Sequence, residues 1–254
     1  MQPCFFIFAI MKHLLMIVSS LLLLETGYTQ TRLSDHNTIA WMATTITPAI
    51  SGKFSGHIEY QWRRSNFFEN WQQGLFRIGV NVKLRDEVVL HGGYGWIITY
   101  PYGDYNLAPV SKAFPEHRLY QQLTITTKLA STSLSHRLRL EQRWVGRFAS
   151  ATSKAPDEFV FLNRLRYMPR LDISLKQDWY ITLFDEIFIG FGKNVGENVF
   201  DQNRLSLLVG KRLNKNIRIE AGYLNQVVQL GREVDNKNVF QYNNGLLCAT
   251  YFNL

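Results

Sequence analysis

The feature that most constrains this chain is a two-residue period in hydrophobicity, which recurs over long stretches. In residues 54–63, one set of alternate positions reads Phe54, Gly56, Ile58, Tyr60 and Trp62, and the other reads Ser55, His57, Glu59, Gln61 and Arg63. Successive side chains of a β-strand point to opposite faces, so this period predicts strands with one apolar and one polar face. We therefore expect an all-β protein.

The pattern predicts eleven candidate strands, joined by connections that alternate between short and long. The candidates are residues 38–46, 53–63, 72–85, 88–100, 117–130, 134–148, 157–170, 177–192, 201–213, 216–229 and 239–254. Short turns are expected at 47–52, 85–87, 130–134, 171–176 and 213–216, and long connections at 64–71, 101–116, 149–157, 193–200 and 230–238. This alternation is typical of an antiparallel up-and-down transmembrane β-barrel of about 10–12 strands.

The number of strands is left open between ten and twelve. Single-chain bacterial barrels usually have an even number of strands, so eleven candidates imply either one missed strand or a first candidate that is not a full crossing. Twelve is the favoured number. The candidate at 177–192 is the least regular, because Asp185 and Glu186 are adjacent and one acid must fall on each face.

A soluble barrel or sandwich also alternates, with its apolar face turned inward. Three features favour the membrane barrel instead. The candidate strands reach about 10–15 residues, whereas soluble strands usually have about five or six. Aromatic side chains such as Trp62, Trp144 and Trp179 lie near strand ends, as in the aromatic girdles of membrane barrels. The chain ends on Tyr251-Phe252-Asn253-Leu254, which resembles the terminal signal read by barrel-assembly machinery.

Residues 1–29 have the organisation of a signal peptide. Lys12 and His13 precede an apolar run at residues 14–24, and Gly27 and Thr29 suit the −3 and −1 positions of a cleavage site. The mature barrel is then residues 30–254, with Cys248 as its one cysteine. The alternative is a membrane anchor over residues 5–24. It would place Lys12 near the middle of the membrane, at a free-energy cost of about 3 kcal/mol. Either Met1 or Met11 can be the start.

The faces predicted to point inward are strongly basic. They carry Arg63, Arg77, Lys83, Arg85, Arg118, Lys128, Arg137, Arg139, Arg143, Arg147, Arg164, Arg166, Arg170, Arg204, Arg212 and Arg218, against Glu59, Glu141, Glu186 and Glu220. We expect same-strand neighbours such as Glu59–Arg63, Arg139–Glu141–Arg143 and Arg218–Glu220 to be close. Two roles fit: arginine–acid ladders that fill a narrow interior, or a cationic path for small anions. A third, binding lipopolysaccharide phosphates, has weaker support because the predicted loops carry mixed charge.

The sequence predicts no catalytic, cofactor-binding or metal-binding residues. His57 and His91 are expected to point inward, but neither lies in a nucleophile or metal-ligand motif. The chain carries a net charge of +8, yet the basic residues are spread along strand faces behind an export signal, which argues against a nucleic-acid partner. An outer-membrane enzyme acting on lipid or surface polymer is the alternative function.

Five segments together resemble the uncharacterised outer-membrane family DUF2490. They are His57-Ile-Glu-Tyr-Gln-Trp-Arg63, Arg137-Leu-Arg-Leu-Glu-Gln-Arg-Trp144, Phe161-Leu-Asn-Arg-Leu-Arg-Tyr167, Asp201-Gln-Asn-Arg-Leu205 and Glu220-Ala-Gly-Tyr-Leu-Asn-Gln226. The resemblance covers nearly all of the mature chain. It implies an outer-membrane barrel of a Gram-negative bacterium and implies no activity, so no functional residue is carried over.

The expected function is that of an outer-membrane barrel with a structural, interaction or narrow transport role. Its expected partners are outer-membrane lipid, lipopolysaccharide and, during biogenesis, the barrel-assembly machinery.

Overall fold

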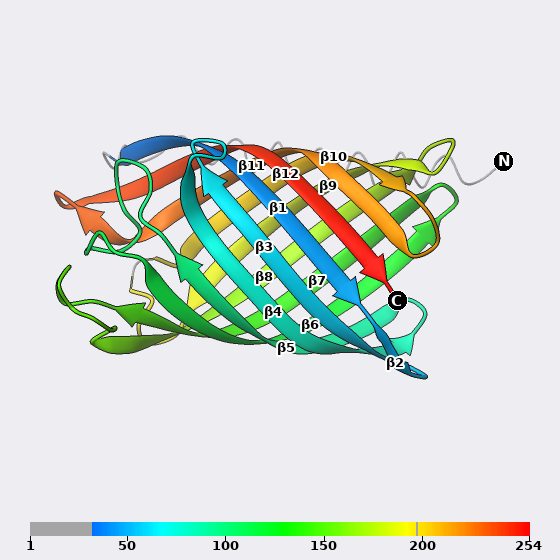
Figure 1. The fold of residues 1–254 in the computed structure, drawn as a ribbon, viewed down its shortest axis with the longest axis horizontal. Helices are drawn as coiled ribbons and strands as arrows, with labels where there is room; N and C mark the ends of the chain where they lie inside the picture. Colours follow the sequence, from blue (N-terminus) through cyan, green and yellow to red (C-terminus); the bar gives the residue numbers. More distant parts are fainter. Residues whose placement is uncertain (1–31, 197) are drawn as a thin grey trace. The chain divides into compact units, whose positions relative to one another are not determined.

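One sheet closes on itself to form a β-barrel from Leu33–Leu254 (Figure 1). The structure is a computed structural model that describes residues 32–196 and 198–254. The predicted signal peptide at 1–29 lies outside the described residues. Within these two ranges, no helix is long and apolar enough to cross a membrane.

The strands follow the predicted alternation closely. They are β1 (Leu33–Thr47), β2 (Ala49–Ser51), β3 (Phe54–Ser65), β4 (Asn70–Arg85), β5 (Val88–Thr99), β6 (Phe114–Leu129), β7 (Thr132–Arg147), β8 (Glu158–Ser174), β9 (Trp179–Phe191), β10 (Phe200–Arg212), β11 (Ile217–Val234) and β12 (Lys237–Asn253). The three-residue β2 continues the line of β1 past Pro48, and both pair with β3. The eleven remaining strands match the eleven sequence candidates.

The expectation of an even number of strands is wrong for the described chain. Neighbouring strands pair antiparallel from β3 round to β12, and the ring then closes through a parallel pairing of β1 with β12. Parallel strands form evenly spaced, slanted hydrogen bonds, so they join two edges as completely as antiparallel strands do. At this seam Gly245 lies opposite Ile39, so the two backbones can approach closely.

The two faces of the wall are inverted relative to a soluble protein. The large exposed hydrophobic side chains include Leu207 (53%), Val209 (52%), Ile78 (49%) and Trp96 (48%), and they lie on the outer face. The buried residues include Arg118 (4%), Arg139 (3%) and Glu141 (0%), which point into the lumen. The predicted assignment of apolar side chains to the outside is therefore confirmed.

The few polar side chains on the outer face pair with one another. The Gln121 and Gln142 amides exchange hydrogen bonds at 3.2 and 3.3 Å, and the Asn203 amide donates to Asp185 at 2.7 Å. Asp185 is exposed while Glu186 is buried, so the adjacent acids fall on opposite faces as predicted.

The connections keep the predicted alternation, with two differences. The connections predicted to be long at 64–71 and 230–238 are reduced to 66–69 and 235–236, because the flanking strands extend further. Asp235 and Asn236 both have positive φ, at 52° and 55°, which suits a two-residue hairpin turn. The end of the barrel with the longer connections 100–113, 148–157 and 192–199 is called the loop end below, and the opposite end the turn end.

Candidate functional site

A network of arginines and acids fills the middle of the lumen. Its centre is Glu141 on β7, whose Oε2 accepts hydrogen bonds from Nε and Nη2 of Arg164 at 2.9 and 2.6 Å. The Glu141 Oε1 accepts from Arg166 Nη1 at 2.6 Å and from Arg118 Nη1 at 3.5 Å. Arg139 approaches to 3.9 Å. One carboxylate thus neutralises charge from three adjacent strands, β6, β7 and β8.

Four more acids extend this arginine–acid network along the barrel. The closest contacts are Glu59–Arg77 at 2.8 Å, Glu116–Arg118 at 2.6 Å, Glu116–Arg143 at 2.8 Å, Glu186–Arg137 at 2.6 Å, Glu186–Arg166 at 2.7 Å and Glu220–Arg170 at 2.5 Å. Charged hydrogen bonds of this length, shared among several guanidinium groups, order a polar interior that would otherwise be costly to bury.

The predicted luminal faces are correct, but the predicted partners are mostly not. Arg63 binds the amides of Gln61 and Gln73 and not Glu59, which pairs with Arg77 across the strands. Arg218 lies 4.1 Å over the Tyr251 ring. Of the expected pairs, Arg139–Glu141 is present, at 3.9 Å. Same-strand pairs do form, as Glu116–Arg118 at 2.6 Å shows, but the register of β3 with β4 sets Glu59 opposite Arg77 and so decides this pairing.

Some predicted luminal residues lie at the rims, and one luminal acid was missed. Lys83, Arg85, Lys128, Arg147 and Arg212 have the inward parity but are exposed near strand ends. Glu116, which was predicted to lie in a loop, is the third residue of β6 and only 2% exposed. The sequence did contain a signal for this position. Glu116 is two residues before Arg118, so the two-residue period places both side chains on the same inward-facing side of the strand.

Aromatic and aliphatic side chains complete the filling of the lumen. Phe188 is fully buried, and the guanidinium carbons of Arg164, Arg166 and Arg204 lie 5.0, 4.3 and 4.6 Å from its ring centre. Tyr120, also buried, is covered by Arg139 at 4.6 Å. Stacked guanidinium groups keep their charge while packing densely. The middle of the lumen is therefore occupied by side chains, as the ladder interpretation predicts.

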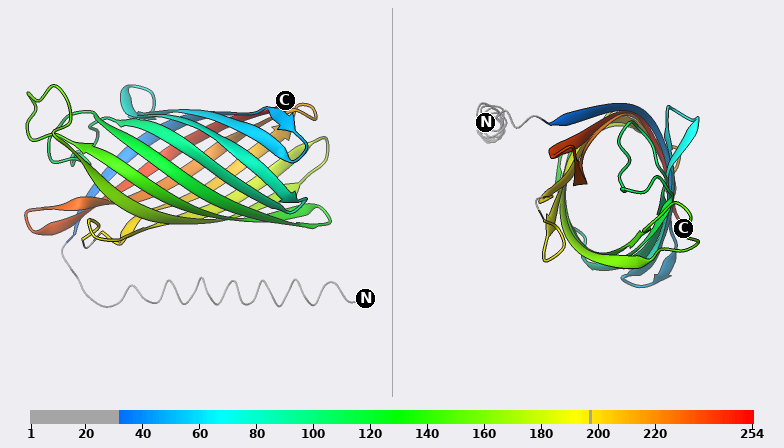
Figure 2. Two further views of the ribbon diagram at one scale, coloured as in Figure 1. Left: turned by 90° about the horizontal axis from the view of Figure 1, so that it is seen from below. Right: turned by 90° about the vertical axis from the view of Figure 1, so that its left-hand side faces the viewer.

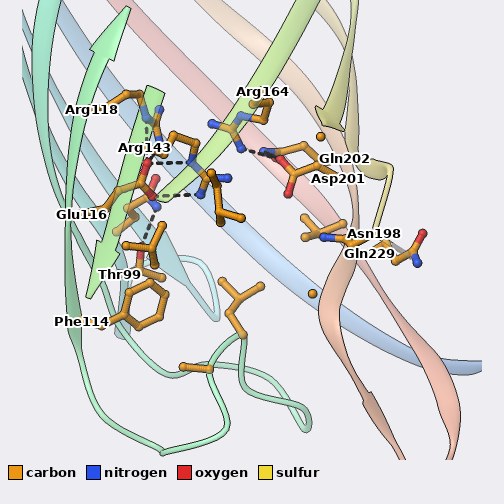
Figure 3. Close-up of a pocket in the computed structure, with 18 of the residues that line it drawn as sticks. Thr99, Phe114, Glu116, Arg118, Arg143, Arg164, Asn198, Asp201, Gln202 and Gln229 are labelled. Atoms are coloured by element: carbon orange, nitrogen blue, oxygen red, sulfur yellow. Dashed lines mark hydrogen bonds and ion pairs between the residues drawn. The ribbon is translucent and has the colours of Figure 1, made fainter. Parts of the chain in front are cut away.

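A cavity of about 310 Å³ remains open at the loop end of the lumen (Figure 3). We call it the vestibule. Its wall contains nine arginines and two acids, namely Arg63, Arg77, Arg118, Arg143, Arg147, Arg164, Arg166, Arg204 and Arg232 against Glu116 and Asp201. Figure 3 shows Arg118 and Arg143 converging on Glu116, while Arg164 reaches Asp201 across the cavity. Glu59, Glu141 and Glu186 lie outside this lining and pair with Arg77, Arg118, Arg164 and Arg166, so the excess of positive charge rests on the arginines that no acid approaches closely.

Two buried arginines of the vestibule contribute much of this excess. Arg63 is 5% exposed, binds Gln73 at 2.6 Å and makes no ion pair among the described residues. Arg204 is 9% exposed, reaches Glu186 only at 3.9 Å, and its Nε has no hydrogen-bond partner in the described part of the chain. Their guanidinium carbons lie 3.8 and 4.9 Å from the ring centre of Trp41. The Trp41 indole N–H donates to Gln72 at 2.6 Å, which fixes the ring between them.

The structure brings together two histidines that the sequence placed on separate strands. The rings of His57 and His91 are 4.5 Å apart, across β4, and each points inward as predicted. His57 contacts Glu59 at 3.2 Å and His91 contacts the Tyr120 hydroxyl at 3.0 Å. Within residues 32–196 and 198–254, no group of three His, Cys, Asp or Glu side chains is arranged to hold a metal ion.

Comparisons with known proteins found a relative, a solved structure and a protein family. An uncharacterised protein of Methylorubrum extorquens is 26% identical over 229 residues, covering 86% of this chain and 90% of that protein. A solved structure described as "NanC porin structure in rhombohedral crystal form" has a TM-score of 0.47 and 10% identity, covering 83% of this chain and 91% of its own. The model of the family DUF2490, described as "Protein of unknown function", matches residues 38–237. The chain therefore belongs to the DUF2490 family.

Proposed function

We propose that this protein is an outer-membrane β-barrel of a Gram-negative bacterium whose vestibule takes up small anionic solutes. The observation that carries the proposal is the composition of the vestibule wall, nine arginines to two acids. A low-dielectric cavity lined by one sign of charge concentrates ions of the opposite sign. Cavities of this volume are within the usual range for small-molecule sites.

The outer face supports the membrane part of the proposal. A continuous apolar wall would be a severe aggregation hazard in water, whereas lipid tails and lipopolysaccharide acyl chains are suitable partners for it. In this arrangement the loop end faces outward and the turn end faces the periplasm, since outer-membrane barrels carry their longer loops outside. Assembly by the barrel-assembly machinery follows as part of the same proposal.

The membrane location predicts a depth-dependent effect of charge on the outer face. Leu207 is 53% exposed near the middle of β10, whereas Leu213 is 54% exposed in the β10–β11 turn. Leu207→Arg should lower the free energy of unfolding in lipid bilayers by about 2–4 kcal/mol, and Leu213→Arg by less than about 1 kcal/mol. Urea titrations in vesicles measure both. Equal small effects, together with a soluble product that does not shift on heating in gels, would refute the membrane barrel.

The anion part of the proposal predicts a change in ion selectivity when the excess charge is removed. Reconstituted in planar bilayers under a potassium chloride gradient, the wild-type barrel should give a small, anion-selective conductance. The double variant Arg63→Gln, Arg204→Gln should lower the anion-to-cation permeability ratio at least about threefold, because the pair supplies uncompensated charge to the vestibule. Arg212→Gln, an exposed site at the turn end, is the matched control.

The outcomes of this measurement are distinct. A wild-type conductance that prefers cations, or a reversal potential that the double variant leaves unchanged, would overturn the anion path. The complete absence of conductance would also end the transport proposal and would leave the filled lumen with a structural role alone. The folded state of each variant is checked by heat-modifiable gel mobility.

A further inference from the structure

We propose that the β5–β6 connection, residues 100–113, is a movable strap that gates the vestibule, and that Asp35 is its latch. This inference rests on the proposed function only in that the vestibule is where solutes enter. It concerns residues 100–113, which lie at the loop end and do not belong to the arginine–acid network. Figure 2, right, shows the strap lying inside the ring of strands and not above it.

The strap leaves the wall at β5 and β6 and crosses part of the lumen. Its middle contacts β1, β12 and β11, which lie three, four and five strands from β5 around the closed ring. The backbone carbonyl of Tyr105 accepts from Gln241 at 2.8 Å, and that of Asn106 accepts from Arg232 at 2.9 Å. Leu107, Ala108 and Pro109 then form part of the vestibule lining. The strap thus covers the cavity from the loop side.

Both ends of the strap are firmly attached to the wall from which it starts. The Tyr100 N–H donates to the Gln72 carbonyl at 3.0 Å, where β5 ends. Lys112 donates to the carbonyls of Ala151 and Ser153 in the β7–β8 connection and lies 4.7 Å from the Phe148 ring centre. These contacts hold both ends of the strap to the wall from which it starts, so motion would take place in its middle.

The middle of the strap is held by a latch with incomplete hydrogen bonding. Asp35 is 2% exposed and makes no ion pair among the described residues, and its Oδ2 accepts at 3.4 Å from the Tyr105 N–H and at 3.2 Å from Gln241. A buried carboxylate without a cation is unfavourable unless its hydrogen bonds are strong. By comparison, the 2.6 Å contact of Glu141 with Arg166 in the arginine–acid network is 0.6 and 0.8 Å shorter than these two contacts of Asp35.

Three more polar atoms around the latch are buried and unpaired. They are Asn37 Nδ2, Gln241 Oε1 and Asn243 Oδ1, which have no hydrogen-bond partner in the described structure. Each such atom carries a substantial desolvation cost. Displacing the strap would admit water to all of them, and their hydration would offset part of the cost of breaking the hydrogen bonds that hold the strap. Tyr102 of the strap is 8% exposed and its hydroxyl accepts from Asn243 at 3.2 Å, so opening would also displace this ring. A gate requires two states that are close in free energy, and hydration of the unpaired atoms reduces the difference between them.

The strap can pack against Asp35 and Asn37 of β1 only because residue 103 is a glycine. Gly103 has φ +73°, a conformation that other residues rarely adopt. A methyl group at this position would overlap the Asp35 carboxylate and lie 2.9 Å from Asn37 Oδ1. The latch, Asp35, therefore depends on Gly103 for its contact with the strap. A change in either residue should release the strap.

Thiol accessibility inside the vestibule tests the gate without reference to anions. Val145, which lines the cavity, is replaced by cysteine in a background that carries Cys4→Ser and Cys248→Ser. The neutral reagent N-ethylmaleimide should label Val145→Cys slowly, and at least about tenfold faster when Asp35→Asn or Gly103→Ala is added. Asp104→Asn, an exposed strap residue, is the matched control and should leave the rate unchanged.

Conductance in planar bilayers tests the same gate with a second measurement. Asp35→Asn should raise the conductance above that of the wild-type barrel, and Asp104→Asn should leave it unchanged. Labelling rates that Asp35→Asn and Gly103→Ala leave unchanged in folded barrels would overturn the gate. If no variant conducts but the labelling rates respond, the gate stands and the anion path fails.

Discussion

Replacing Glu141 by glutamine is expected to produce the largest loss of stability of any single substitution in the lumen. The carboxylate is fully buried and lies within 4 Å of Arg118, Arg139, Arg164 and Arg166. Its removal leaves several buried guanidinium groups with too little negative charge nearby. Breaking one buried ion pair costs about 3–5 kcal/mol, and this site breaks more than one. The free energy of unfolding should therefore fall by at least about 3 kcal/mol.

Urea unfolding in detergent micelles, followed by tryptophan fluorescence, measures this loss. Glu87→Gln is the control, because Glu87 is exposed in the β4–β5 turn. Adding Arg166→Gln to Glu141→Gln should recover part of the stability, since one uncompensated charge is then removed. A loss of less than about 1 kcal/mol, with no recovery in the double variant, would mean that the network contributes little to folding.

Replacing Gly245 by alanine is expected to prevent the barrel from closing. A methyl group there would overlap the Ile39 carbonyl oxygen and lie 2.6 Å from the Ile39 carbonyl carbon. The obstacle is backbone and not a flexible side chain, so β1 and β12 would have to separate. We expect a loss of about 3 kcal/mol or more, or no heat-modifiable species at all. Gly92→Ala is the control, since a methyl at Gly92 meets nothing within 4 Å among the described residues.

A disulfide tests the seam independently of stability. In the parallel register, Met42 lies opposite Cys248, and both side chains are exposed on the outer face. Met42→Cys should therefore oxidise with the native Cys248, whereas Thr44→Cys, two residues further along β1 and opposite Thr250, should not. Oxidation of Thr44→Cys in place of Met42→Cys, or of neither, would show that the parallel seam is incorrect.

The strand positions and the direction of each side chain could be predicted from the sequence because both depend on local periodicity. Leu205, Leu207 and Val209 alternate with Arg204 and Ser206, and any register of neighbouring strands keeps that alternation. The candidates consequently matched the strands to within a few residues. The closure of the ring could not be predicted, because it depends on which edges meet, and the Gly245–Ile39 contact joins residues far apart in the chain.

The arginine-rich lumen could likewise be predicted, but its charge balance could not. Parity placed Arg63 and Glu59 on one face, while the register of β3 with β4 sets Glu59 opposite Arg77. This register leaves Arg63 without a carboxylate partner, so it binds the side-chain amides of Gln61 and Gln73 instead. Its charge therefore adds to the positive charge of the vestibule. The position of the strap could not be predicted at all. Residues 101–116 have no hydrophobic period that distinguishes a loop folded into the lumen from a loop in solvent.

The parallel seam also determines at which end of the barrel the first strand begins and the last strand finishes. Since β1 and β12 run in the same direction, Leu33 lies at the loop end and Leu254 at the turn end, as the arrows in Figure 1 show. A barrel with an even number of strands returns both ends to one side. In the proposed orientation, an epitope fused directly ahead of Leu33 would be displayed at the cell surface, and one fused after Leu254 would remain in the periplasm.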